Sequence, residues 1–278
     1  MPELPEVETI ANGVDVRVRG QRIVQAWCCS HPQPFKTPAA RQAKGLEGRA
    51  ILWVHRTGKH IVCELGGPSS QSGDHPAAQW VVHLGMTGRL LVTTPDAPVA
   101  PHTHARLSLS GGKELRFVDP RRFGRLEFRD LSGKAGFSAQ GAEPLTIAAE
   151  EFAALFHPRR LSIKAALLNQ ALLAGVGNIY ADESLFRAGI RPRKSSSRLT
   201  RAELERLRAA LLQVLKDAIR LGGSSVSDYV DAEGMHGFFQ LEHCVYLRTG
   251  LPCRRCATPI KRILVAGRGT HYCPKCQR

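Results

Sequence analysis

Four cysteines near the C-terminus have the spacing of a metal site. Cys253 and Cys256 form the pair "CRRC", and Cys273 and Cys276 form the pair "CPKC", with residues 257–272 between them. Two such pairs place four thiolates around one tetrahedral ion, an arrangement typical of a zinc ribbon. Because four thiolates leave no open coordination position, the expected Zn²⁺ is structural. Two redox pairs are the alternative interpretation.

The N-terminal stretch is the second candidate for chemistry. "MPELPEVETI" is acidic, although the chain carries a net charge of +15. One interpretation is a helix start, because proline is favoured at the first helical position and glutamate complements the positive end of the helix dipole. The other is that the terminus itself is a reagent. The stretch alone does not decide between them.

Hydrophobic periodicity predicts the elements that must position these groups. A helix is expected over residues 1–19, ended by Gly20. Residues 21–129 contain short β-rich runs separated by Gly, Pro and Ser clusters, a pattern typical of an antiparallel sandwich or barrel. Residues 66–79 resemble a loop insertion within it.

From about residue 150 the pattern becomes helical. The clearest helix follows Thr200, which with Glu203 can form a capping box. Its apolar stripe contains Leu204, Leu207, Leu211, Leu215 and Ile219. A Gly/Ser-rich loop follows over residues 221–240.

The bulk composition limits the class of partner. The chain has 278 residues, with 39 Lys and Arg against 24 Asp and Glu. Such a basic balance predicts a polyanionic partner, nucleic acid before an acidic membrane. We find no uninterrupted apolar stretch of about 18 residues and no signal-peptide pattern, so we expect no membrane partner and a cytoplasmic location.

Five motifs in fixed order carry a family resemblance. They are "PELPEVET" at the N-terminus, "HLGMTGRL" at 83–90, "DPRRFGRL" at 119–126, "GVGNIYADESLFRAGI" at 175–190 and the terminal "CRRCATPI…GRGTHYCPKCQ". Together they resemble the bacterial formamidopyrimidine-DNA glycosylases, over essentially the whole chain. Leu4 favours this branch over the endonuclease VIII branch, which usually begins Pro-Glu-Gly-Pro.

The resemblance implies an α+β multidomain protein. We expect an N-terminal antiparallel β-sandwich domain with an N-terminal helix over 1–132 and a linker over 133–149. A helix-two-turn-helix DNA-binding domain follows over 150–240, including a lesion-capping loop at 221–238. A zinc ribbon over 241–278 completes the chain.

The same resemblance implies base excision repair of oxidised purines, followed by strand cleavage. Removal of Met1 would leave Pro2 as a secondary amine, and α-amino groups have pKa values of about 7.7–8.0, so part of it is unprotonated. Pro2 is then the Schiff-base nucleophile, and Glu3 is the proton donor, supported by Glu6. Lys59 and Arg268 are expected to contact phosphate and to donate protons for β- and δ-elimination, respectively.

DNA contacts are implied at further positions. A base must leave the duplex before its sugar can be attacked. Met86, Arg121 and Phe123 match the family's void-filling residues, with Arg121 facing the orphaned cytosine. The remaining implied DNA contacts are Arg122, Lys164, Asn178 and His104.

Two positions depart from the family pattern. His60 stands where tyrosine is frequent, and Asn169 stands where aspartate is frequent. The expected partner is double-stranded DNA with oxidised purines, bound by a nucleoid-associated bacterial monomer without an organic cofactor. Two alternatives explain the charge and the cysteines but not the N-terminal motif: a non-catalytic zinc-ribbon DNA-binding protein, and a ribosome- or RNA-associated protein.

Overall fold

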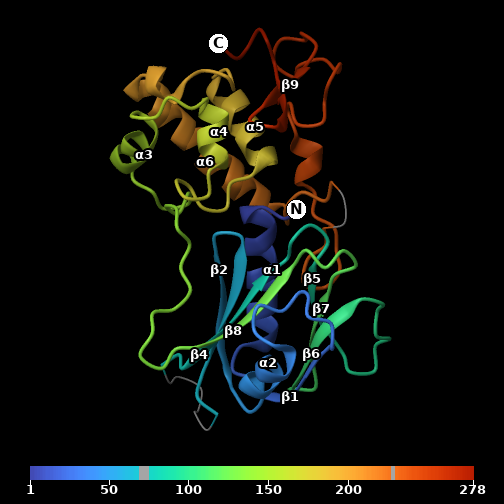
Figure 1. Cartoon of the computed structure of the whole chain (residues 1–278). Helices are drawn as coiled ribbons and strands as arrows, with labels where there is room; N and C mark the ends of the chain where they lie inside the picture. The colour runs from blue at the N-terminus through green and yellow to red at the C-terminus, as the bar shows by residue number, and fades with distance from the viewer. Residues whose placement is uncertain (69–74, 227–228) are drawn as a thin grey trace. The chain divides into compact units, whose positions relative to one another are not determined.

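The computed structural model describes residues 1–68, 75–226 and 229–278 and divides into two compact units (Figure 1). The first unit comprises Met1–Ser138 and Gly222–Gly237, and the second comprises Ala139–Leu221 and Phe238–Arg278. Part of the loop expected at 66–79, residues 69–74, lies outside the described residues. So do residues 227–228 of the loop expected at 221–238.

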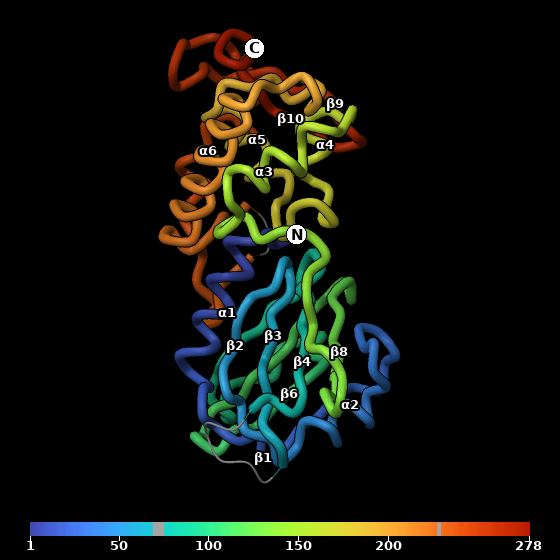
Figure 2. The backbone as a smooth tube through the Cα atoms, turned by 90° about the vertical axis from the view of Figure 1, so that its left-hand side faces the viewer, coloured from blue at the N-terminus to red at the C-terminus, as the bar shows by residue number. Residues whose placement is uncertain are grey.

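Two four-stranded antiparallel sheets build the first unit. One has the order β1-β6-β7-β5 and the other the order β2-β3-β4-β8; the strands of the latter run side by side in Figure 2. The bounds are β1 Ile23–Cys28, β2 Ile51–Thr57, β3 His60–Leu65, β4 Ala78–His83, β5 Arg89–Thr93, β6 Thr103–Leu109, β7 Glu114–Val118 and β8 Arg125–Asp130. The predicted antiparallel architecture is confirmed.

The core of this unit lies beneath the N-terminal helix. Helix α1, Leu4–Val18, buries the apolar positions that the sequence pattern picked out: Val7, Ile10, Val14 and Val18. They join one hydrophobic cluster with residues of both sheets, including Trp80 and Phe117. A second helix that the sequence analysis did not identify, α2 (Ala39–Leu46), adds Leu46 to the same cluster.

The second unit is helical and ends in a hairpin. Its elements are α3 Ala149–Phe156, α4 Ile163–Leu168, α5 Asn178–Ala188, η1 Ser196–Arg198, α6 Arg201–Arg220, η2 Phe239–Glu242, β9 Lys261–Val265 and β10 Arg268–Tyr272. The capping box of Thr200 and Glu203 at the start of α6 is confirmed. Leu204, Leu207, Leu211 and Leu215 are buried as predicted, whereas Ile219 is half-buried.

The loop expected with the helical domain belongs to a different unit. Residues Gly222–Gly237 group with the sandwich because the Val92 amide donates to the carbonyl oxygen of Ala232 over 2.9 Å and Arg17 pairs with Glu233. Long-range backbone pairing of this kind leaves no periodic trace in the sequence. Within the described parts of the chain, no helix combines the length and apolarity needed to cross a bilayer.

Candidate functional site

The N-terminal residues are held by the first turn of α1. Pro2 is buried, Glu3 is 5 % exposed, and Met1 is 51 % exposed. Glu3 is the N-cap of α1, and its backbone amide donates to Glu6 Oε2 over 2.8 Å, within a reciprocal capping box. The helix therefore fixes the backbone immediately after Pro2.

Glu6 has a second partner from a distant part of the chain. Its other carboxylate oxygen, Oε1, accepts from the backbone amide of Ser224 over 2.8 Å. A Cβ placed on Gly223, which has φ +82°, would lie 3.0 Å from Glu6 Cγ, so this approach favours glycine. Nearby, the Tyr229 hydroxyl donates to the Gly222 carbonyl oxygen, and burial raises the pKa of Tyr229 strongly. Glu6 thus joins the start of α1 to the segment after α6.

Lys59 lies in the turn between β2 and β3. Gly58 supplies the positive φ of that turn, and Lys59 is half-buried. The next residue, His60, packs its ring 4.8 Å from the ring of His83 and 4.6 Å from that of Phe137. The histidine at the departure from the family pattern therefore contributes a ring to a small aromatic cluster beside Lys59.

Both histidines of that cluster are held neutral. Burial is the main cause that lowers the pKa of His60 to about 4, followed by His83 and Lys36. Burial also lowers the pKa of His83 to about 4, with smaller contributions from nearby cations including Lys59 and Arg125. His83 Nδ1 accepts from the Gly85 amide over 3.2 Å, which the neutral ring allows.

Two short loops present exposed side chains of the types expected for a wedge. Met86 is 43 % exposed in the loop after β4, and Phe123 is 48 % exposed in the loop before β8. Arg121 places its guanidinium 4.7 Å from the ring centroid of Phe123, a cation–π arrangement. Arg122 is exposed and adopts φ +55°. Two apolar tips and two cations are thus available to a ligand of the first unit.

A buried carboxylate, which the sequence analysis missed, connects these loops. Asp119 Oδ1 accepts from the Thr87 hydroxyl over 2.6 Å, and Oδ2 accepts from the Gly124 amide over 2.7 Å. Asp119 has no exposed surface. Its place at the head of "DPRRFG", where an Asp can cap a turn, was the available sequence signal.

His104 does not offer its ring to a ligand. It is 4 % exposed, its Nε2 donates to the Asp119 carbonyl oxygen over 3.0 Å, and its Nδ1 lies 3.3 Å from Cys29 Sγ. The predicted DNA contact of His104 is therefore wrong, because both ring nitrogens have partners inside the fold. His102, two residues earlier, is exposed.

Lys164 is also directed inward. Its ammonium lies 2.7 Å from Asp182 Oδ1 and donates to the Gly269 carbonyl oxygen and the Thr270 hydroxyl over 3.1 and 2.8 Å. Lys164 has no exposed surface, so the predicted phosphate contact is wrong. The ammonium instead supports strand β10.

The start of α5 and the first residues of β10 lie together. Asn178, the first residue of α5, donates from Nδ2 to the Gly269 carbonyl oxygen over 3.0 Å. Arg268, which begins β10, is exposed. Asp182 Oδ2 accepts from the His271 amide over 2.8 Å. Helix α5 and Lys164 therefore fix the backbone that follows Arg268, and Asp182 is a second supporting residue that the sequence analysis did not identify.

Glu183 has the structural location that its sequence context suggested. Its carboxylate accepts from three consecutive backbone amides, those of Cys244, Val245 and Tyr246, at 2.9–3.0 Å. The side chain is fully buried, and burial raises its pKa, while these amides lower it. Glu183 holds the chain where it leaves η2.

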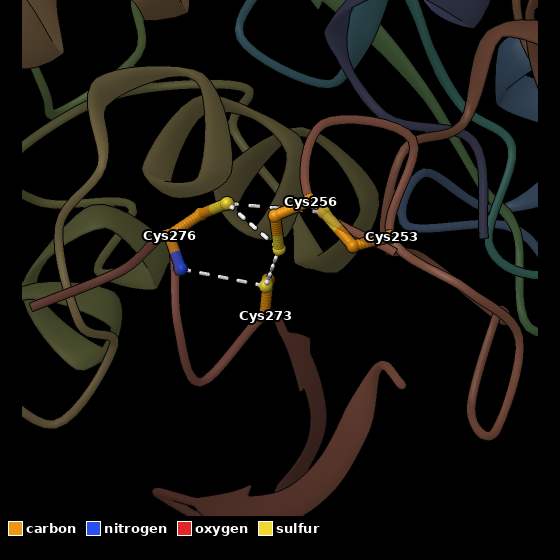
Figure 3. Close-up of side chains that lie close together, drawn as sticks. All are labelled: Cys253, Cys256, Cys273 and Cys276. Carbon is orange, nitrogen blue, oxygen red and sulfur yellow. Dashed lines mark hydrogen bonds between the residues drawn. The ribbon is translucent and has the colours of Figure 1, made fainter. Parts of the chain in front are cut away.

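The four C-terminal cysteines converge as a tetrahedral site requires (Figure 3). Their sulfur atoms all lie within 4.8 Å of one another, and three sulfur pairs are 3.4–3.9 Å apart. Tetrahedral Zn²⁺ with Zn–S bonds of about 2.3 Å needs sulfur separations of about 3.8 Å. The amides of Arg255 and Cys276 donate to Cys253 Sγ and Cys273 Sγ, which stabilises thiolates. The residues fit one structural zinc ion.

Comparison with known proteins gives matches along the chain. Three family models match: the formamidopyrimidine-DNA glycosylase N-terminal domain over residues 1–126, the formamidopyrimidine-DNA glycosylase H2TH domain over 141–230, and a zinc finger found in FPG and IleRS over 250–278. The chain is 45 % identical to a formamidopyrimidine-DNA glycosylase of Solibacter usitatus, with all of both chains covered. It is 46 % identical to that of Moorella thermoacetica, covering 95 % of this chain and 94 % of the relative.

Solved structures agree with these matches. The MutM (Fpg) protein of Thermus thermophilus is similar with a TM-score of 0.84 and 41 % identity, covering 99 % of this chain and 98 % of that one. The Lactococcus lactis Fpg in complex with DNA containing an abasic site is similar with a TM-score of 0.87 and 34 % identity, covering 99 % of both chains.

Proposed function

The chain belongs to the formamidopyrimidine-DNA glycosylase family, and from this premise we propose that it excises oxidised purines from duplex DNA and then cuts the strand. The proposed substrates are 8-oxoguanine and ring-opened formamidopyrimidines. The related Lactococcus lactis structures contain DNA with a formamidopyrimidine lesion or an abasic site, which supports this substrate class. The net charge of +15 suits the polyanionic partner.

The nucleophile is the amine of Pro2 after Met1 has been removed. The nitrogen attacks C1′ of the damaged nucleotide, the bond from C1′ to the base breaks, and the base leaves with the electron pair of that bond. A secondary amine forms an iminium that cannot lose a proton from nitrogen. The iminium acidifies the C2′ hydrogen, so β-elimination and then δ-elimination expel the flanking phosphates.

The capping arrangement at α1 is the observation that carries this proposal. Glu6 holds the Glu3 amide, so the residue that follows the nucleophile has a fixed position. Glu3 then donates the proton that opens the sugar, and Glu6 supports both residues without reacting. The carboxylates beside the amine explain the acidic start of a basic chain.

Cations complete the chemistry at the phosphates. Lys59 is proposed to contact the phosphate beside the lesion and to donate a proton during β-elimination. Arg268, exposed at the start of β10, is proposed to act likewise in δ-elimination. Zn²⁺ has no catalytic step, because the four thiolates complete its coordination; it stabilises the module that includes the β9–β10 hairpin.

The two loops of the first unit are proposed to replace the extruded base. Met86 and Phe123 are apolar side chains of the kind that enter base steps. Arg121 then donates hydrogen bonds to the orphaned cytosine, which gives a preference for cytosine opposite the lesion. The exposed side chain of Arg122 contacts the DNA backbone.

Borohydride trapping tests the catalytic part of the proposal. Reduction of the iminium should join Pro2 covalently to DNA containing 8-oxoguanine or an abasic site, and peptide mapping should locate the adduct at Pro2. The preparation must first be shown by intact mass to lack Met1. Processed protein that binds this DNA but forms no adduct contradicts the lyase mechanism and favours a non-catalytic DNA-binding protein.

A further inference from the structure

Asp119 uses each of its polar atoms inside the fold. Its backbone amide donates to the His102 carbonyl oxygen, and its carbonyl oxygen accepts from His104 Nε2, both over 3.0 Å. The carboxylate accepts from the Thr87 hydroxyl over 2.6 Å and from the Gly124 amide over 2.7 Å. Asp119 is fully buried, so the carboxylate serves the protein and has no free position for a ligand.

The partners of the carboxylate belong to two different loops. Thr87 follows Met86 in the loop between β4 and β5, whereas Gly124 follows Phe123 in the loop between β7 and β8. The amide of Arg121 also lies 3.3 Å from Oδ1. One ionised side chain thus joins the loop that carries Met86 to the loop that carries Arg121 and Phe123, through hydrogen bonds strengthened by its charge.

The backbones of the two loops also touch. Gly85 has φ +63°, and a Cβ there would lie 2.5 Å from the carbonyl carbon of Phe123. A Cβ on Gly124 would lie 2.9 Å from the His83 carbonyl oxygen. At such contacts neither loop can shift alone without an overlap of backbone atoms. The close approach and the carboxylate therefore constrain the same pair of segments.

We propose that Asp119 is a positioning residue that makes the two loops one preassembled wedge. Met86 then enters the duplex and Arg121 reads the opposite base as a single event. This inference rests on the proposed function, in which these side chains fill the gap left by the extruded base. Loops ordered during folding avoid an ordering cost at each binding event, so the tether favours extrusion of an intact base.

Two variants loosen the tether to different degrees. Asp119→Asn keeps the shape but replaces one acceptor oxygen with an NH₂ group, which cannot accept from both the Thr87 hydroxyl and the Gly124 amide. Thr87→Val removes one hydroxyl and leaves the carboxylate in place. Asp130→Asn is the matched control, because Asp130 is an exposed carboxylate at the end of β8 that binds Ser132.

The assay compares substrates that differ in the work done by the wedge. Single-turnover excision of 8-oxoguanine opposite cytosine and opposite adenine is compared with cleavage of a preformed abasic site, which has no base to extrude. We expect Asp119→Asn to slow excision by about tenfold to a hundredfold, the range for an unsatisfied buried hydrogen bond. It should also reduce the preference for cytosine and leave abasic-site cleavage within about threefold of wild type. Amide exchange over residues 120–124 of the free protein should accelerate.

Each outcome decides one claim. Wild-type excision rates and opposite-base preference in both Asp119→Asn and Thr87→Val overturn the inference and leave the glycosylase function standing. An equal loss on lesion and abasic substrates indicates a general structural role and also overturns it. A wild-type protein that excises nothing contradicts the proposed function instead, and the exchange data then still show whether Asp119 holds the two loops together.

Discussion

The ammonium of Lys164 and the carboxylate of Asp182 lie 2.7 Å apart, and neither side chain has any exposed surface. The pair joins α4 to α5. Both residues also bind β10, Lys164 through Gly269 and Thr270 and Asp182 through the His271 amide. A charge pair that the sequence suggested for DNA therefore organises the second unit from within.

Lys164→Met should destabilise the second unit by about 3–5 kcal/mol, because it leaves the Asp182 carboxylate buried and uncompensated. Adding Asp182→Asn should recover part of the loss, since the remaining charge is removed. Urea unfolding followed by far-UV circular dichroism measures both. The exposed Lys216→Met is the control. A Lys164→Met midpoint equal to that of the control contradicts the supporting role.

Glu6→Gln should reduce borohydride trapping by about tenfold, because an amide has only one acceptor oxygen for the two amides that Glu6 now binds, those of Glu3 and Ser224. The expected change is in the trapping rate at saturating DNA, with the dissociation constant nearly unchanged. Glu205→Gln, on the exposed face of α6, supplies the control. Unchanged trapping would show that this geometry does not serve the nucleophile.

Zinc removal should abolish tight DNA binding while most of the helical content remains. The bound metal contributes about 10–16 kcal/mol to folding in zinc-finger peptides, and the small hairpin module has few other buried groups. Cys253→Ser should act like chelation. Cys244→Ser should keep wild-type affinity, because Cys244 is not one of the four clustered ligands. Fluorescence anisotropy with abasic DNA measures both variants; equal affinities would reject the structural role of the metal.

Acidification should weaken the first unit between about pH 6.5 and pH 4. His60 and His83 have pKa values lowered to about 4 by burial, whereas unfolded histidine titrates near about 6.5. The unfolded chain therefore binds more protons in this window, so stability rises with pH there and these two groups add no further change above it.

Tryptophan fluorescence isolates this effect, since the chain's three tryptophans, Trp27, Trp53 and Trp80, all belong to the first unit. We expect His60→Phe to flatten the dependence of the urea midpoint on pH, because one of the two buried histidines is removed. The exposed His157→Phe should retain the wild-type slope. A slope unaffected by His60→Phe would contradict the assignment.

Local signals in the sequence predicted elements well. The buried stripe of α1 and the capping box of α6 depend on residues within about a turn of one another, so spacing alone reveals them. The cysteine pairs did likewise for the metal site, because ligand spacing encodes its geometry. Strand runs predicted the antiparallel architecture but gave no sheet order, which depends on pairings between distant segments.

Exposure was the property that the sequence could not supply. Lys164 and His104 have residue types that suit DNA, yet each is buried by partners distant in sequence, Gly269 and Asp119 among them. The same limit hid Asp119 and Asp182, which act through segments that only the folded chain brings together. Family resemblance identified the region in each case and did not establish which side chains face outward.

The three amides collected by Glu183 set the order in which the second unit can assemble. They are satisfied by a carboxylate on α5, so the chain is anchored at Tyr246 before the first cysteine ligand, Cys253, is reached. The helices and this anchor can therefore form in the absence of metal. Zinc capture becomes the last step of maturation, and a cell short of zinc would accumulate a folded, protease-sensitive precursor that ends in an open tail.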